Sequence, residues 1–283
     1  MTYMQIITDA SGELKDAGIT NARMEAIWLL AAVTGLTRAD FFLKSADAVE
    51  PAVRERYERL VARRAQGEPL QYLIGETEFY GMRLKTGPGV FIPRPETEVL
   101  VEKALATYPG HGDICDLCTG SGAVALSLAH HLESDKPIQI CATEISGTAM
   151  RYALENRERL ACHNVHLYEG NLFEPLPSDK QFSMVTANPP YVHPDMYEDL
   201  AAEVRLNEPR EALLSEEQGL RVVGEIIRDA VSRLLPGGWL MCEISPEQTQ
   251  AVRQQFAPEY YCGVHTVKDY AGKERIVAAQ RRG

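Results

Sequence analysis

The sequence predicts an α/β fold in which a small all-α domain precedes a doubly wound, mostly parallel sheet. Two observations lead to this prediction. The first seventy residues carry apolar side chains at helical spacing and almost no strand signal, whereas beyond residue 110 short apolar strands alternate with amphipathic helices. Such alternation is typical of a parallel sheet with helices on both of its faces.

Composition limits the class of protein. The chain has 283 residues, of which 45% are hydrophobic and 24% charged, as in soluble globular proteins. No apolar run reaches the roughly 18 residues needed to span a membrane, and the N-terminus lacks the pattern of a signal peptide. Six cysteines are too sparse for a disulfide framework, so we expect a cytoplasmic protein. The net charge of −11 disfavours direct binding of nucleic acid.

Three segments of the first part predict helices, because their apolar residues recur on one face opposite charged residues. Thr20 or Asn21 is a candidate cap for the second helix, and Gly35 and Gly67 are candidate stops. The mixed charges of residues 54–64 favour a solvated helix face, and a docking face for a partner is the alternative. The three segments span residues 12–19, 22–36 and 52–67.

Residues 76–95 predict a β-hairpin or linker. Short alternating runs are broken there by glycine and proline at positions 87–89, 93 and 95. A helix is expected to open near Pro95, since Glu96 and Glu98 would lie in its first turn, where the helix dipole favours acidic groups.

The remaining residues predict the main sheet and its helices. The last two strands are close enough to form an antiparallel hairpin through Ala271 and Gly272. Strands are expected at residues 113–118, 138–144, 165–169, 182–187, 239–244, 263–268 and 274–280, and helices at 123–132, 147–160, 218–235 and 248–256.

Three features follow predicted strands, at the sheet edge where ligands bind in such folds. The first is "DICDLCTGSGAVAL", a strand that enters a glycine turn and then a helix. Gly120 and Gly122 would let a ligand approach the backbone, and the following helix start offers free N–H groups. A dinucleotide fingerprint needs a third glycine that is absent here, and this absence argues against a nicotinamide dehydrogenase.

The second feature is Glu144, which ends the next predicted strand. An acid at this position can accept hydrogen bonds from both hydroxyls of a ribose. An acid that caps the following helix is equally natural when taken alone. Its order after the glycine turn favours the ligand interpretation.

The third feature is "MVTANPPYVHP", residues 184–194, in which a buried strand ends in a rigid corner. Two consecutive prolines remove two backbone donors and stop the strand. Asn188 and the carbonyl of Pro189 provide two acceptors that can hold both hydrogens of an –NH2 group, and Tyr191 can stack on a planar group. A plain turn is the alternative.

Together these features resemble those of S-adenosylmethionine-dependent methyltransferases that act on planar amino or amide nitrogens. Narrower segments resemble the peptide-chain release factor glutamine methyltransferases. They are "RRAQGEPLQYLIGETEFYG", "FIPRPETEVLVE", "EVRLNEPREALLSEEQGL" and "VKDYAGKERIV". The resemblance implies a Rossmann-like methyltransferase domain at 96–283 after a hairpin linker at 76–95, and a helical substrate-recognition domain at 1–75. It also implies methylation of the glutamine side-chain nitrogen (N5) in the Gly-Gly-Gln loop of release factors, in a protein expected to be monomeric.

The same resemblance assigns roles to individual residues. Glu144 would bind the ribose hydroxyls of S-adenosylmethionine, and Asn171 and Leu172 would flank its adenine. Phe79 would help to wall the substrate pocket. The loop expected to hold the methionine portion consists of Cys118, Thr119, Gly120, Ser121 and Gly122. The corner expected to hold the substrate glutamine consists of Asn188, Pro189, Pro190 and Tyr191, and Asn188 would also contact the cofactor.

Two positions depart from the family pattern, which usually has glycine in place of Cys118 and often an aromatic residue in place of Leu172. Cys118 is expected to fit if its φ is negative and to be strained if φ is positive. Cys115 and Cys118 form a C-x-x-C pair, but no second pair follows at metal-binding spacing, so no metal is expected.

Other functions stay open at this point. The same chemistry could act on a ribosomal-protein glutamine or on an exocyclic amine of nucleic acid. Because of Cys118 and Leu172, the chain could also be a cofactor-binding module without catalysis.

Overall fold

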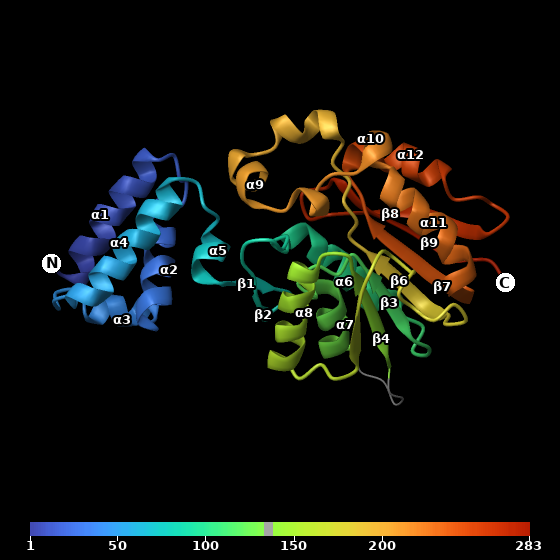
Figure 1. Cartoon of the computed structure of the whole chain (residues 1–283), viewed down its shortest axis with the longest axis horizontal. Helices are drawn as coiled ribbons and strands as arrows, with labels where there is room; N and C mark the ends of the chain where they lie inside the picture. Colours follow the sequence, from blue (N-terminus) through green and yellow to red (C-terminus); the bar gives the residue numbers. More distant parts are fainter. Residues whose placement is uncertain (133–137) are drawn as a thin grey trace. The chain divides into compact units, whose positions relative to one another are not determined.

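A computed structural model describes residues 1–132 and 138–283 of the chain. The described residues form two compact units (Figure 1). The first comprises residues 1–76 and 201–207, and the second comprises 77–200 and 208–283. Within these ranges no helix combines the length and apolar character needed to cross a lipid bilayer.

The first unit is helical, as the sequence predicts. Thr2 caps the first helix in a capping box with Gln5, which satisfies backbone donors at both positions. Gly35 ends the second helix at φ +72°, which confirms the predicted stop. The helices of residues 1–76 are α1 (Tyr3–Asp16), α2 (Ala22–Thr34), α3 (Arg38–Leu43), α4 (Pro51–Ala65) and α5 (Leu70–Ile74).

Tyr57 is fully buried in the helical core and donates from its hydroxyl to the carbonyl of Ala26 at 3.0 Å. The charged face of α4 is only partly solvated. Arg64 is buried and pairs with Glu25 at 2.6 Å and with Glu203 at 2.9 Å. Glu203 belongs to α9 (Ala202–Asn207), so this short segment contributes an ion pair to the helical unit. A buried guanidinium with two carboxylate partners fixes where the segment attaches.

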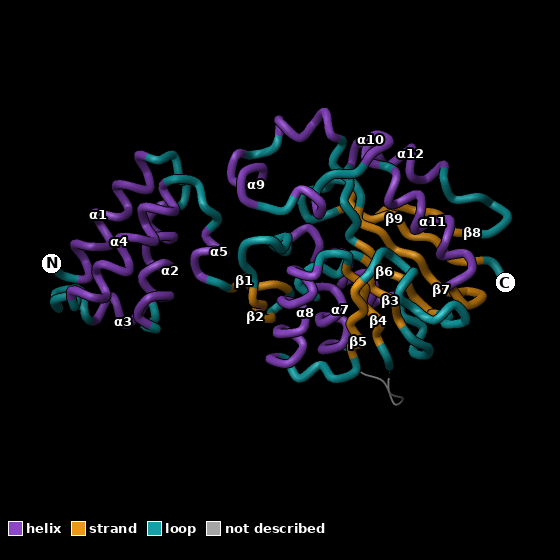
Figure 2. The backbone as a smooth tube through the Cα atoms, in the orientation of Figure 1, coloured by secondary structure: helices purple, strands orange, loops and turns teal. Residues whose placement is uncertain are grey.

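The second unit contains the predicted hairpin and the predicted main sheet (Figure 2). β1 (Glu76–Phe79) and β2 (Met82–Lys85) form the two-stranded sheet. In the described residues, seven strands form the larger sheet in the order β5-β4-β3-β6-β7-β9-β8. They are β3 (Ile114–Leu117), β4 (Ile140–Glu144), β5 (Val165–Glu169), β6 (Phe182–Ala187), β7 (Leu234–Glu243), β8 (Tyr261–Lys268) and β9 (Glu274–Arg281).

The direction of the strands confirms the predicted fold class. β3 to β7 pair in parallel, whereas β9 is antiparallel to both β7 and β8. The chain runs outward from β3 to β5 on one side and then returns to place β6 on the other side of β3. Such a reversal next to the first strand is the point where doubly wound sheets bind ligands.

Helices cover both faces of the large sheet. α6 (Glu98–Thr107), α7 (Ala123–His131) and α8 (Gly147–Arg159) pack on one face, and α11 (Arg221–Arg233) and α12 (Thr249–Gln254) pack on the other. Successive strand residues accordingly belong to two separate buried clusters, as Ile114 and Cys115 do.

The region after the corner carries short elements that the sequence analysis does not anticipate. β7 also begins at Leu234, ahead of the predicted residue 239. The unanticipated elements of this region are the 3₁₀ helices η2 (Pro194–Asp199) and η3 (Arg210–Ala212), and the short helices α9 and α10 (Glu216–Gly219).

Candidate functional site

The glycine loop and the Asn-Pro-Pro-Tyr corner start at adjacent points of the sheet. β3 and β6 are paired neighbours, and their last residues, Leu117 and Ala187, lie opposite each other. Cys118 and Asn188 therefore leave the same edge side by side. The structure thus brings together two of the three features that the sequence analysis places at a ligand site.

Glycine is required at two points of the loop. Gly120 and Gly122 have φ of +60° and +86°, a region that side chains rarely adopt. A Cβ on Gly122 would also lie 2.8 Å from the Leu126 side chain, whereas one on Gly120 would meet nothing within 4 Å. The open space at Gly120 is available to a ligand. Ser121, between them, holds a buried hydroxyl that has no hydrogen-bond partner in the described structure.

Glu144 is tied directly to this loop. Its Oε2 accepts from the backbone N of Gly120 at 2.8 Å, and its Oε1 accepts from the N of Ser146 at 2.9 Å. Burial raises the pKa of the carboxyl, and these backbone donors oppose the rise. Each carboxylate oxygen has more than one lone pair, so each can also accept from a ligand hydroxyl.

Asp116 on β3 is a residue whose role sequence reasoning missed, although it is the second aspartate of the quoted stretch "DICDLCTGSGAVAL". Its Oδ2 accepts from the Thr119 hydroxyl at 2.6 Å and its Oδ1 from the Thr186 hydroxyl at 2.7 Å. The carboxylate therefore joins the glycine loop to β6, which leads into the corner. Burial raises the pKa of Asp116 to about 6, while these hydrogen bonds partly offset the increase.

We expect Asp116 to make folding stability depend on pH. A carboxyl whose pKa is raised in the folded state contributes stability that is complete below its unfolded pKa and lost as pH rises through the folded value. The free energy of unfolding of the wild type minus that of Asp116→Asn should therefore fall by up to about 3 kcal/mol between pH 4 and pH 8. Denaturant unfolding at several pH values measures this difference. A difference that stays constant with pH would contradict the assignment.

Cys118 and Leu172 share an unusual backbone conformation. Their φ values are +56° and +45°, in the left-handed region. For Cys118 the positive φ meets the condition under which the sequence analysis expects strain. The position accepts cysteine at an energetic cost, because the Cβ of an L-residue crowds the following carbonyl there.

Substitutions at Cys118 should separate backbone strain from side-chain chemistry. Cys118→Gly should change the unfolding free energy by less than about 1 kcal/mol, because relieved strain offsets the greater freedom of the unfolded chain. Cys118→Val should destabilise by more than about 2 kcal/mol, since a β-branched side chain is a severe outlier at positive φ. Thermal and denaturant unfolding of both variants provide the comparison. Equal stability of the two would show that the backbone is not strained at this position.

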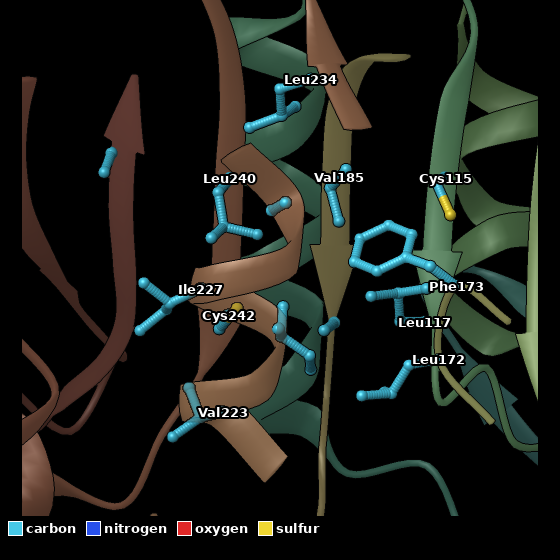
Figure 3. Close-up of a cluster of buried hydrophobic side chains, with 14 of the residues drawn as sticks. Cys115, Leu117, Leu172, Phe173, Val185, Val223, Ile227, Leu234, Leu240 and Cys242 are labelled. Carbon is cyan, nitrogen blue, oxygen red and sulfur yellow. The ribbon is translucent and has the colours of Figure 1, made fainter. Parts of the chain in front are cut away.

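Asn171 and Leu172 follow β5, and the backbone N of Gly170 donates to the carbonyl of Glu144 at 2.9 Å. Asn171 donates from Nδ2 to Glu174 at 3.1 Å, which leaves its Oδ1 as an acceptor. Leu172 belongs to the buried cluster beside Leu117 and Phe173 (Figure 3). Asn171 and Leu172 also line a pocket of about 600 Å³ against α11, whose lining includes neither Glu144 nor Asn188.

The corner is held by side chains from other segments. Asn188 donates from Nδ2 to the Thr97 hydroxyl at 3.1 Å, and the Tyr191 hydroxyl donates to Oε1 of Glu243 at 3.4 Å. Thr97 lies in the "IPRPETE" segment and Glu243 ends β7. Burial, and then the nearby Glu243 charge, raises the pKa of Tyr191, so this residue is a neutral hydrogen-bond donor. The sequence analysis identifies neither Thr97 nor Glu243.

Gln248 forms hydrogen bonds both to the corner and to a loop with a strained backbone. Its Nε2 donates to the carbonyls of Tyr191 at 2.8 Å and Gln218 at 2.9 Å. Glu217 and Gln218 have φ of +53° and +60°, which costs roughly 1–2 kcal/mol for each residue. Gly219 follows at φ +80°, and a Cβ there would lie 2.1 Å from the Tyr191 carbonyl oxygen. The loop thus packs its backbone directly against the corner.

Residues of the narrow motifs contact one another. Arg94 of "IPRPETE" pairs with Glu208 of "EVRLNEPREALL", and Glu208 also accepts from the backbone N of Ile92 at 3.2 Å. Glu98 accepts from the backbone N of Tyr80 at 2.8 Å. Phe79 is buried in the core with Met82 and neighbouring residues, so its side chain has almost no exposed surface for a substrate.

Among the side chains of residues 1–132 and 138–283, no group of three His, Cys, Asp or Glu is arranged to hold a metal ion. Cys115 and Cys118 are free thiols, and Cys115 is buried in the strand. The C-x-x-C spacing is thus occupied by one strand residue and one turn residue.

Comparison with known proteins gives matches to both units of the chain. Residues 5–75 match a family described as the PrmC N-terminal domain. Residues 81–224 match the methyltransferase small domain. Together these two matches extend from the helical unit through the glycine loop and the corner.

Three curated relatives are similar over nearly the whole chain, and each is named release factor glutamine methyltransferase. The protein of Geobacter sulfurreducens is 38% identical over 99% of this chain and 96% of its own length. That of Vibrio cholerae is 36% identical over 99% of this chain and 97% of its own length. That of Moorella thermoacetica is 38% identical over 100% of this chain and 99% of its own length.

Solved structures share the fold at low identity. A methyltransferase from Pyrococcus furiosus superposes with a TM-score of 0.53 and 18% identity, over 81% of this chain and 98% of its own. The Thermus thermophilus 16S rRNA N2 G1207 methyltransferase, solved with AdoMet and guanosine, superposes with a TM-score of 0.53 and 18% identity, over 73% of this chain and 50% of its own. These similarities support the fold class alone.

Proposed function

This chain belongs to the release factor glutamine methyltransferase family, and we propose that it methylates the side-chain amide nitrogen (N5) of a release factor glutamine with S-adenosylmethionine. The substrate glutamine is the one in the Gly-Gly-Gln loop. One observation carries the assignment to this site: the amide of Asn188 donates to Thr97. Its oxygen is therefore left to accept from a substrate amide at the edge where the glycine loop also begins.

The residues present suit the cofactor. The open space at Gly120, the buried unpartnered hydroxyl of Ser121 and the carboxylate of Glu144 offer room, a polar contact and two acceptors. We assign the methionine portion to Cys118, Thr119, Gly120, Ser121 and Gly122, the ribose to Glu144 and the adenine to Asn171 and Leu172.

The reaction depends mainly on positioning. The nitrogen of a glutamine amide is a weak nucleophile, because its lone pair is delocalised into the carbonyl. S-adenosylmethionine supplies an electrophilic sulfonium methyl group when bound. Asn188 Oδ1 and the Pro189 carbonyl accept the two N–H groups of the substrate and so orient its lone pair. As the nitrogen gains positive charge, both acceptors bind it more strongly, so they stabilise the transition state more than the ground state.

The corner is stiff enough for this role. Two prolines fix φ at successive positions, and Gln248 holds the Tyr191 carbonyl that follows them. The Tyr191 hydroxyl donates to Glu243, which restricts the position of this side chain. Little conformational freedom is left for a bound substrate to remove.

Two other substrates would use the same chemistry: a ribosomal-protein glutamine and an exocyclic amine of nucleic acid. The net charge of −11 argues against nucleic acid, whose phosphates favour a basic surface. The near full-length similarity to proteins named for release factors argues for the factor. We also propose that the protein acts as a cytoplasmic monomer, and that its helical unit contacts the factor away from the Gly-Gly-Gln loop.

Transfer of a radiolabelled methyl group from S-adenosylmethionine tests the proposal. A purified release factor, the ribosomal proteins and bulk RNA are incubated separately with the protein at equal concentration. Label should enter the factor and leave the other two near background. Preferential labelling of ribosomal protein or RNA would reassign the substrate, and bound cofactor with no labelling at all would favour a non-catalytic module.

A further inference from the structure

A buried carboxyl group lies behind the Asn-Pro-Pro-Tyr corner without a full set of partners. Glu243, at the carboxyl end of β7, is 1% exposed. Its Oε1 accepts from the Tyr191 hydroxyl at 3.4 Å, but its Oε2 has no hydrogen-bond partner among the described residues. A buried carboxylate oxygen left in this state is costly, so its presence beside the proposed site calls for an explanation.

Thr97 connects this carboxyl to Asn188. The Thr97 side chain is buried, and its hydroxyl oxygen accepts from Nδ2 of Asn188 at 3.1 Å. The nearby Thr97 and Tyr191 hydroxyls also favour the ionised form of Glu243 by lowering its pKa. The Thr97 hydroxyl thus accepts from the amide, and its own proton is available for the unpartnered oxygen of the nearby carboxyl.

The direction of these hydrogen bonds follows from the number of protons available. An ionised carboxylate can only accept, and a hydroxyl has a single proton to donate. If Thr97 gives that proton to Glu243, its oxygen can only accept from Asn188. The Asn188 amide must then turn its NH2 group toward Thr97, and its oxygen points away toward the substrate side.

We propose that Glu243 and Thr97 are positioning residues that fix the Asn188 amide with its oxygen toward the substrate. This inference rests on the proposed function, because it concerns the same corner. The ionised carboxylate selects one of the two orientations of the amide, and the wrong orientation would present a donor to a substrate that itself donates. Glu243 would thus act on the reaction through Thr97 and Asn188, without contacting the substrate amide or the methyl group.

The charge state of Glu243 should therefore matter to the orientation. Burial raises the pKa of Glu243 to about 7, and the nearby Glu96 adds to the rise. Arg275 on β9 opposes it, although Arg275 also pairs with Asp269 at 3.3 Å. When protonated, Glu243 can donate to Thr97, whose own proton is then free to turn toward Asn188. The productive orientation should be lost as pH falls through this value.

Three variants test the proposal. Thr97→Val removes the hydroxyl at nearly constant volume, and Thr97→Ser restores it. Glu243→Gln keeps the shape but cannot ionise. Thr97→Val and Glu243→Gln should each lower kcat by roughly tenfold or more, whereas the cofactor Kd should change less than about twofold. Thr97→Ser should stay near the wild type. The double variant should be no worse than either single variant, because both act through one chain of hydrogen bonds.

The pH profile and a spectroscopic signal separate positioning from a general loss of structure. In the wild type, kcat should fall below about pH 7, and this dependence should disappear in Glu243→Gln. The side-chain NH2 signals of Asn188 in ¹⁵N NMR spectra, identified by their absence in Asn188→Ala, should titrate with the same midpoint. They should become independent of pH in Thr97→Val.

The outcomes also distinguish this inference from the proposed function. An active wild type whose Thr97→Val variant keeps its kcat would overturn the inference and leave the function intact. An inactive wild type would overturn the function. The Asn188 NMR signals would then still decide the inference, because they need no substrate: titration lost in Thr97→Val supports the hydrogen-bond chain, and unchanged titration refutes it.

Discussion

Replacing Asn188 with alanine should lower the kcat of methyl transfer to a release factor by about a hundredfold or more. The side-chain oxygen is one of two acceptors proposed to hold the substrate amide, and loss of one positioned group that binds the transition state commonly costs a factor of 10² to 10³. Thr97 fixes the Asn188 amide, and alanine has no group that could replace its oxygen. The Pro189 carbonyl alone should therefore not hold the substrate amide in the reactive geometry. Steady-state kinetics with saturating cofactor measure the effect.

Cofactor binding provides the control for this variant. The Kd for S-adenosylmethionine, measured by calorimetry, should change far less than kcat, although Asn188 lies next to the glycine loop. Gln254→Ala removes an exposed amide on α12 and should leave both quantities unchanged. Equal losses of binding and turnover in Asn188→Ala would assign the residue to the cofactor instead of the substrate.

Glu144→Gln should weaken cofactor binding by roughly 10- to 100-fold, as expected when hydrogen bonds to a charged group are lost. The ionised carboxylate accepts from the backbone N of Gly120 and of Ser146 and keeps lone pairs for ribose hydroxyls. An amide in its place would direct an NH2 group at one of these two backbone donors. The variant should therefore disturb the loop as well as the ligand contact, and calorimetric titration with S-adenosylmethionine measures the combined loss.

Glu259→Gln is a suitable control for the change of charge, because Glu259 is exposed and lies just before β8. Its cofactor Kd should match that of the wild type. If Glu144→Gln bound the cofactor as tightly as Glu259→Gln, the ribose assignment would be wrong, and Glu144 would serve only to hold the glycine loop.

Much of the fold could be predicted from the sequence, because hydrophobic periodicity and turn residues are local signals. The alternation of strands and helices beyond residue 110 gives the parallel sheet, and Ala271 and Gly272 give the final hairpin. The segment at 201–207 is different. It belongs to the helical unit and forms an ion pair with it between Arg64 and Glu203, which are far apart in the chain and carry no local signal.

The candidate site shows the same limit. Glycine turns, a strand-terminal acid and an Asn-Pro-Pro-Tyr corner are visible as motifs, so the sequence analysis could place them at one sheet edge. Thr97, Glu243 and Gln248 are ordinary residues in the sequence, and their importance comes from contacts across the fold. The backbone strain at Cys118 could not be predicted for another reason: the sign of its φ is known only from the structure.

Tandem mass spectrometry of a whole release factor, after incubation with this protein and S-adenosylmethionine, tests the central claim most directly. We expect a gain of one methyl group, about 14 Da, and fragment ions that place it on the side chain of the Gly-Gly-Gln glutamine. The modification should be absent with Asn188→Ala. A methyl group on any other residue, or an unmodified factor while the cofactor is bound, would contradict the account of the corner as the site that holds this glutamine.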